Sequence, residues 1–157
     1  MEHLPLFPIL IPLIAAPICA LIGQRTFLWA FLNIVTWTTF IFSVALLYNV
    51  NLDTPITYPM GGWAAPIGIE YKVDFTNAFL MVLVSGIAAL VSVYARRSVE
   101  YEIDLDRHNI YCSAFLLCLT GLLGIMVTGD AFNVYVFLEI SSLASYAIVS
   151  VGRDPRA

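Results

Sequence analysis

Charged residues are scarce in this sequence. Only 11% of its 157 residues are Asp, Glu, Lys or Arg, whereas 61% are hydrophobic. A typical soluble domain carries about 25% charged residues, so this composition excludes an ordinary water-soluble fold. The apolar residues are grouped into runs of roughly twenty, which is the length that spans a hydrocarbon core of ~30 Å. The sequence therefore predicts an all-α membrane protein.

Motifs for cofactors, metals and nucleic acids are also missing. The three cysteines, Cys19, Cys112 and Cys118, lie within apolar runs and match neither a disulfide framework nor a metal-ligand spacing. The sequence contains no Gly-rich phosphate loop and no nucleophile–base motif. Its basic residues are dispersed rather than clustered, which gives nucleic-acid binding no support. We therefore expect no cofactor, no metal and no nucleic-acid partner.

Five segments have the length and apolarity of transmembrane helices. They cover about residues 4–23, 27–48, 75–95, 110–128 and 131–151, and they form a single membrane domain over residues 1–157. The first segment contains four prolines, so we expect it to be kinked or only partly helical.

The connections between these segments differ in character. Residues 49–74 carry Gly and Pro between β-prone runs, which predicts a short β-hairpin on the membrane surface, with GGW in its turn. Residues 96–109 are rich in charge and predict a loop. Gly129 and Asp130 predict a tight turn, so the fourth and fifth segments should form an antiparallel helical hairpin.

The basic residues predict the orientation of the chain. The connections after the first, third and fifth segments carry six arginines: Arg25, Arg96, Arg97, Arg107, Arg153 and Arg156. The only lysine, Lys72, lies between the second and third segments. Because basic residues are retained on the cytoplasmic side, we expect the N-terminus and the hairpin outside and the C-terminus inside a cell membrane.

One acidic residue differs in its position from the other ten. Glu139 lies near the middle of the fifth segment, in FNVYVFLEISSLASYAIVS, whereas the others fall in loops, turns or termini. An ionised carboxylate at that depth costs at least about 2.5 kcal/mol. Glu139 must therefore face protein or water rather than lipid.

Helical geometry places hydroxyl groups on the same face as Glu139. At 100° per residue, Tyr135, Ser142, Tyr146 and Ser150 share an arc of roughly 80° with the carboxylate. We call these five residues the Glu139 polar line. It can organise water across part of the membrane, with Glu139 as the proton-loading site. The alternative is structural: Glu139 pairs with a Lys or Arg of another helix, and the hydroxyls are packing groups. We favour the proton path, the usual role of intramembrane ionisable residues.

Two other titratable residues are weaker candidates. Asp130 precedes the fifth segment, where we interpret it as a helix cap. His108 borders the fourth segment, where we interpret it as a solvated boundary histidine, with a proton relay as the alternative. Thr120, Gly124 and Thr128 recur at helical spacing, which indicates a close-packing face before it indicates a pathway.

The run TGDAFNVYVFLEISSLASYAIVS, residues 128–150, resembles the fourth-to-fifth helix region of the proton-pumping antiporter-like subunits. These subunits occur in Mrp-type sodium/proton antiporters, in the membrane arm of respiratory complex I and in membrane-bound hydrogenases. The segments LPLFPILIPLIAAPICALIG and YPMGGWAAPIGIEYKVD are most similar to the Mrp D subunit. The resemblance covers the whole chain.

The resemblance implies both a fold and a site. The family has about fourteen helices, including two inverted five-helix repeats. It places the residue matched by Glu139 in the ion path, paired with a lysine of the seventh helix. This sequence stops after its fifth apolar segment, so the resemblance is to the N-terminal part only.

The resemblance also implies a function. It predicts a proton-translocating subunit, or an N-terminal fragment of one, in a multi-subunit monovalent cation/proton antiporter. Its partners would be other membrane subunits, protons, the lipid bilayer and, as a further candidate ion, sodium. One alternative is a proton-pumping subunit of a complex I-like NADH:quinone oxidoreductase or a membrane-bound hydrogenase, with the electron chemistry on other subunits. A second alternative is a passive scaffold.

Overall fold

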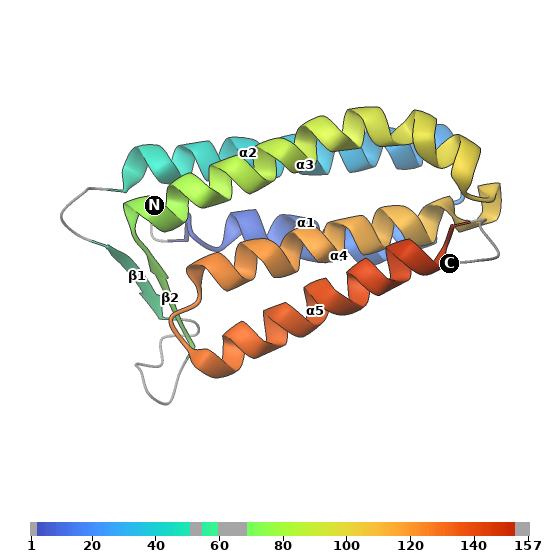
Figure 1. The fold of residues 1–157 in the computed structure, drawn as a ribbon. Helices are drawn as coiled ribbons and strands as arrows, with labels where there is room; N and C mark the ends of the chain where they lie inside the picture. The colour runs from blue at the N-terminus through green and yellow to red at the C-terminus, as the bar shows by residue number, and fades with distance from the viewer. Residues whose placement is uncertain (1–2, 51–54, 60–68, 153–157) are drawn as a thin grey trace.

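The computed structural model describes residues 3–50, 55–59 and 69–152. In these residues, five α-helices run along one long axis and a two-stranded sheet lies at one end (Figure 1). The elements in chain order are α1 (Phe7–Leu21), α2 (Arg25–Asn49), β1 (Ile56–Pro59), β2 (Glu70–Val73), α3 (Phe75–Glu102), the 3-10 helix η2 (Leu105–Arg107), α4 (His108–Val127) and α5 (Ala131–Ser150).

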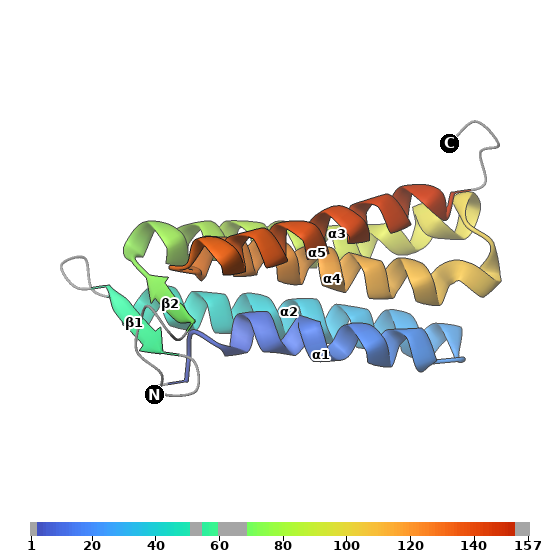
Figure 2. The same cartoon turned by 90° about the horizontal axis from the view of Figure 1, so that it is seen from below.

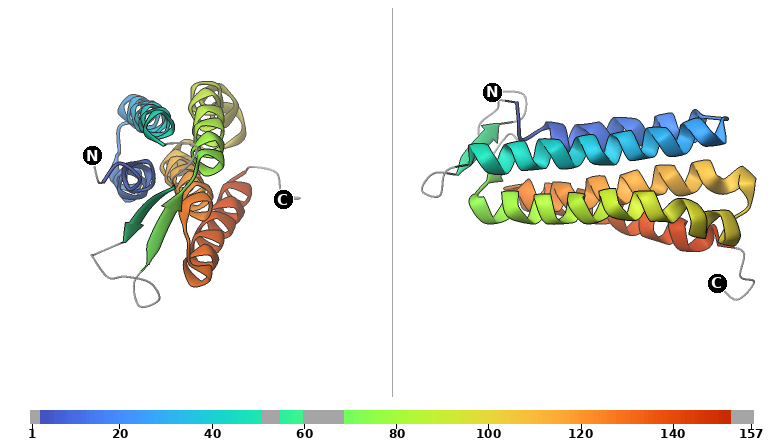
Figure 3. Two further views of the ribbon diagram at one scale, coloured as in Figure 1. Left: turned by 90° about the vertical axis from the view of Figure 1, so that its left-hand side faces the viewer. Right: turned by 90° about the horizontal axis from the view of Figure 1, so that it is seen from above.

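Helix α4 lies at the centre of the bundle. It packs against α1, α3 and α5, while α2 packs against α1 and α3. Figure 2 shows α1 and α2 side by side on one side of the molecule and the other three helices on the opposite side. The end-on view in Figure 3 places α5 at the periphery, where it packs mainly on α4. One long face of α5 is therefore left open.

The described helices agree with a membrane protein. Four of them, α2, α3, α4 with η2, and α5, are long and apolar enough to cross a bilayer. Helix α1 has 15 residues, or about 22 Å at 1.5 Å per residue, and is shorter than a hydrocarbon core. It contains Pro12 and Pro17 and covers less of the chain than the expected segment 4–23. The structure thus confirms a helical membrane fold with four candidate spans.

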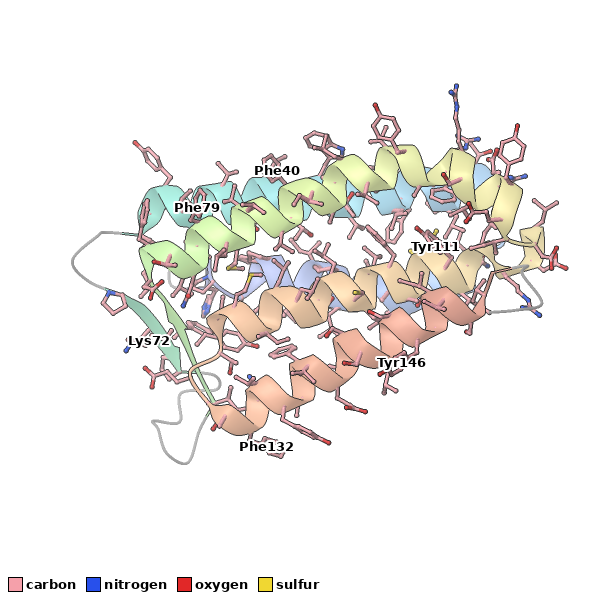
Figure 4. All side chains as sticks on the ribbon, in the orientation of Figure 1. Phe40, Lys72, Phe79, Tyr111, Phe132 and Tyr146 are labelled. Carbon is pink, nitrogen blue, oxygen red and sulfur yellow. The ribbon has the colours of Figure 1, made fainter. Side chains whose placement is uncertain are left out.

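The expected β-hairpin is present as a small antiparallel sheet. Strand β1 pairs with β2, so that Ile56 lies opposite Val73 and Pro59 opposite Glu70. On β2 the side chains alternate as a strand requires: Tyr71 and Val73 are buried, whereas Lys72 is exposed (Figure 4). The predicted GGW turn falls outside the described residues.

The prediction of a charged loop over residues 96–109 is wrong for most of its length. Helix α3 continues to Glu102, and α4 already begins at His108. Arg and Glu are good helix formers, and Arg96 and Glu100 form an i,i+4 ion pair at 3.2 Å. Apolar length therefore underestimated the helix, because its last turns need no apolar side chains to remain helical.

Helices α2 and α3 are joined by a small polar cluster. The Ser92 hydroxyl of α3 donates to Asn33 Oδ1 at 3.0 Å and lies 3.1 Å from the Thr36 hydroxyl, both on α2. Ser92 and Thr36 are fully buried. Polar side chains in an apolar bundle are costly unless they are paired, so these hydrogen bonds fix the register of α2 against α3.

Two glycines bring α4 and α5 into close contact. A Cβ added at Gly121 would lie 2.7 Å from the backbone oxygen of Phe137 and 2.6 Å from Ser141 Cβ. A Cβ added at Gly124 would meet the Phe137 ring at 2.3 Å. This agrees with the packing face predicted around Gly124, because small residues let membrane helices approach closely.

Gly121→Ala should therefore destabilise the α4–α5 pair. The added methyl group meets backbone atoms that cannot rotate away, and overpacking of this kind costs about 1–3 kcal/mol. Thermal unfolding of the protein purified in detergent measures the effect. Gly23→Ala is the matched control, because no atom lies within 4 Å of a Cβ at Gly23. Equal melting temperatures for the two variants would contradict the close contact.

Candidate functional site

Helix α5 has one inward and one outward face. The buried side chains recur at helical spacing and are Asn133, Phe137, Ser141 and Ala144. Glu139 lies two residues from both Phe137 and Ser141, so at 100° per residue it points about 160° away from each of them. Its side chain is accordingly exposed at the surface of the chain. The contact with α4 thus turns the carboxylate outward.

The predicted hydroxyl residues also lie away from α4. The side chains of Tyr135 and Tyr146 are 64% and 70% exposed, Ser150 is exposed and Ser142 is half-buried. Figure 4 shows Tyr146 on the side of α5 that faces away from the other helices. The structure therefore places the Glu139 polar line on the open face of the helix, and its role as a proton path stays a prediction.

Glu139 has no partner among the described residues: neither a hydrogen bond nor an ion pair reaches it in residues 3–50, 55–59 and 69–152. The basic residues that could pair with a carboxylate lie at the bundle ends. Arg25 and Arg96 pair with Glu100 at 3.0 and 3.2 Å at one end, and Lys72 lies on β2 at the other end. An unpaired carboxylate at mid-helix cannot face lipid without a large cost, so this face requires cover by protein or water.

Asp130 caps α5. Its Oδ2 accepts a hydrogen bond from the Asn133 backbone N–H at 3.3 Å, and an anion at this position also interacts favourably with the helix dipole. This geometry agrees with the capping interpretation of the sequence.

The interpretation of His108 as a solvated residue is wrong. His108 is 1% exposed at the start of α4, and its ring meets that of Trp29 edge to face at 6.2 Å. Neither ring nitrogen has a hydrogen-bond partner in the part of the chain that the structure describes. The turn between α3 and α4 buries the residue because α2 packs over that end of α4. Position along the sequence could not show this.

A polar cluster at the start of α5 was not predicted from the sequence. Asn133 is 7% exposed and donates through Nδ2 to the Thr128 hydroxyl at 2.9 Å. Its side chain is also hydrogen-bonded to Tyr71 of β2. The available signal was the helical phase of Asn133, which places it with Phe137 rather than with Glu139.

Grooves and ligand clusters do not coincide with the Glu139 polar line. One groove between α1, α4 and α5 has mainly apolar walls, which include Leu117, Ile140 and Leu143. A second groove lies between α3 and α4 and is almost entirely apolar. Among the described residues, no group of three or more His, Cys, Asp or Glu could hold a metal ion.

Comparison with known proteins identifies relatives along nearly the whole chain. The chain is 39% identical to "NADH-quinone oxidoreductase subunit N" of Desulforudis audaxviator, over 96% of the chain and 30% of the relative. It is 35% identical to "Putative antiporter subunit mnhD2" of Staphylococcus haemolyticus, over 98% of the chain and 30% of the relative. No family model matches the chain.

Solved structures give the same result for the fold. An archaeal membrane-bound sulfane sulfur reductase, described as a respiratory membrane complex, matches 92% of the chain with a TM-score of 0.81 and 29% identity. The Mrp complex from Dietzia matches 92% with a TM-score of 0.79 and 26% identity. The chain spans 30% and 26% of the length of these two structures.

These matches confirm the resemblance to the antiporter-like subunits that the sequence indicates. They cover less than a third of each relative, as an N-terminal portion would. This chain is therefore a multi-pass membrane protein of the antiporter-like subunit family, which includes the Mrp D subunit and the N subunit of complex I, and it corresponds to a part of such a protein.

Proposed function

We propose that this chain is the N-terminal part of a proton-translocating subunit in a multi-subunit monovalent cation/proton antiporter of the cell membrane. The observation that carries the proposal is Glu139, a carboxylate at mid-helix on the open face of α5, without a partner among the described residues. Membership of the antiporter-like subunit family supports the same function.

In the proposed mechanism, Glu139 loads a proton that reaches it along the hydroxyls of the Glu139 polar line. A carboxylate in a low-dielectric site changes its proton affinity strongly when a cation approaches or withdraws. Movement of a cationic side chain in the complex would therefore drive proton release. The described part of the chain offers no such cation near Glu139, so it must come from further along the polypeptide or from another subunit.

The open face of α5 fits this assignment of partners. The relatives are about three times as long as this chain, so further helices are available to cover the Glu139 polar line. Other membrane subunits would pack against the exposed apolar side chains of the bundle. Sodium is a further candidate ion for the complex, and the family comparison does not bear on where it would pass.

We also propose that α1 crosses the membrane as a fifth span. It runs beside α2 and α4, and the turn at residues 3–6 extends it toward the hairpin end. The arginines of the described chain gather at the opposite end, around the α1–α2 and α3–α4 connections. The positive-inside rule then places that end in the cytoplasm, with the hairpin outside.

A second candidate function is proton pumping in a redox-driven complex. It is favoured by the 39% identity to a protein named for NADH–quinone oxidoreduction. The electron chemistry would then belong to other subunits. Sodium-dependent proton exchange in vesicles would favour the antiporter, whereas proton uptake that depends on quinone reduction or hydrogen would favour the redox complex.

Glu139→Gln in the full-length protein should abolish proton transport while the complex still assembles. Glutamine keeps the size and polarity of the side chain but cannot release a proton at physiological pH. The measurement is fluorescence-monitored antiport in everted vesicles, with assembly followed by native electrophoresis.

Glu100→Gln is the matched control for this change. Glu100 is also a helical glutamate, but it pairs with arginines at the bundle end, so antiport should be retained. If Glu139→Gln prevents assembly instead, Glu139 is a structural ion-pair partner and the protein is a scaffold at this position.

Tyr146→Phe should slow transport several-fold and leave assembly unchanged, because it removes one hydroxyl from the Glu139 polar line. Tyr94→Phe removes an equally exposed hydroxyl from α3, where Tyr94 is 80% exposed, and should have no effect. Initial antiport rates at saturating cation distinguish the two. Equal rates for both variants would remove Tyr146 from the path.

The fifth span predicts that the two ends of α1 are accessible from opposite sides. Single thiols would be introduced as His3→Cys and Gly23→Cys after Cys19, Cys112 and Cys118 have been replaced by serine. A membrane-impermeant maleimide should label position 3 from outside and position 23 only from the cytoplasmic side. Lys72→Cys and Arg97→Cys calibrate the two sides. Labelling of both α1 positions from one side would rule out the span.

A further inference from the structure

The β-hairpin is fastened to the α4–α5 turn by backbone hydrogen bonding. The Gly129 N–H donates to the Glu70 carbonyl oxygen at 2.9 Å, and Tyr71 and Thr128 pair as an isolated antiparallel bridge. A Cβ at Gly129 would lie 3.2 Å from the Glu70 oxygen, so the glycine permits this close approach. The turn thereby extends the edge of β2.

Side chains continue this contact into the first turn of α5. Tyr71 is 3% exposed and is hydrogen-bonded to the Asn133 side chain. Asn133 in turn donates to the Thr128 hydroxyl at 2.9 Å, while its backbone N–H is held by Asp130. We call Tyr71, Thr128, Asp130 and Asn133 the α5 anchor. It joins three parts of the fold: the hairpin, the turn and the helix.

The α5 anchor is not part of the Glu139 polar line. Asn133 precedes Glu139 by six residues, which at 100° and 1.5 Å per residue puts the two side chains about 120° apart and about 9 Å apart along the axis. Burial raises the pKa of the Tyr71 phenol and the hydrogen bond with Asn133 opposes this rise, so the phenol carries no charge at neutral pH. A role in holding the helix fits these observations, whereas a role in carrying protons does not.

Helix α5 has few other restraints at this end, because it packs mainly on α4. A slip of one residue along α4 would move Glu139 by about 1.5 Å and rotate it by about 100°. Such a slip would take the carboxylate off the open face. Whatever fixes the first turn of α5 therefore fixes the depth and direction of Glu139.

We propose that Tyr71 and Asn133 are positioning residues, which use the β-hairpin to set the depth and rotation of Glu139. The consequence for Glu139 rests on the proposed proton-path function, whereas the attachment of α5 to the hairpin does not. The hairpin thereby becomes a part of the transport machinery that touches no proton.

The test uses Tyr71→Phe and Asn133→Ala in the full-length protein within its complex, with two measurements. Amide hydrogen exchange should become about three- to tenfold faster over residues 131–137, as expected when a buried hydrogen bond is lost, and should stay unchanged in the middle of α3. The pH at which antiport is half-maximal should shift, because the surroundings of Glu139 change with its depth.

Tyr58→Phe is the matched control. Tyr58 belongs to β1 of the same hairpin, but its hydroxyl contacts His3 at 2.8 Å and not α5, so both measurements should match the unmodified protein. Asn133→Ala provides a second test should Tyr71→Phe disturb the hairpin itself.

The outcomes separate the inference from the proposed function. Unchanged exchange over residues 131–137 in both variants overturns the anchor. Faster exchange with an unaltered pH profile leaves a tether and overturns the positioning of Glu139. If Glu139→Gln transports normally, the proton-path function fails, and the exchange measurement still decides whether the α5 anchor holds the helix.

Discussion

The close contact between α4 and α5 is the constraint on which the site depends. Gly121 and Gly124 lack side chains, so the backbone of α5 approaches α4 closely and Phe137 fills the space beside Gly124. A helix that commits one face to such a contact must turn the opposite face away. The outward direction of Glu139 follows from this packing, without any interaction of the carboxylate itself.

The placement of charge gives the open face its meaning. In the described residues, the acidic groups other than Glu139 lie near the ends of the bundle or on the hairpin, where water can solvate them. Buried hydroxyls such as Ser92 and Thr36 are paired inside the bundle. Glu139 has neither water at a bundle end nor a partner in the described chain. The surface around it therefore corresponds to an interface or a hydrated path, and the greater length of the relatives supplies the chain to form it.

Several features could be predicted because they depend on local physical chemistry. Long apolar runs indicate spanning helices, Gly and Pro between β-prone runs indicate a hairpin, and an aspartate before an apolar helix indicates a cap. The helical period was enough to place Tyr135, Glu139 and Tyr146 on one face. Each of these inferences depends on residues that lie close together along the chain.

The failures share the opposite property. The end of α3 at Glu102 lies beyond its apolar run, because a helix can leave the membrane and continue in water. The burial of His108 depends on Trp29, which is distant in the sequence, packing against it. The contact between Tyr71 and Asn133 depends on the hairpin folding back over the α4–α5 turn. No local pattern carries such information.

The sequence by itself determined the class of the protein, its helices, and the isolation of one carboxylate in an apolar helix, because hydrophobic length and helical period act along the chain. Only the tertiary structure decided which face of α5 packs inward, since that depends on two glycines of α4 meeting Phe137 and Ser141. It also decided that β2 holds the first turn of α5. Both features are contacts between separate elements, and their free energy exists only once those elements have come together.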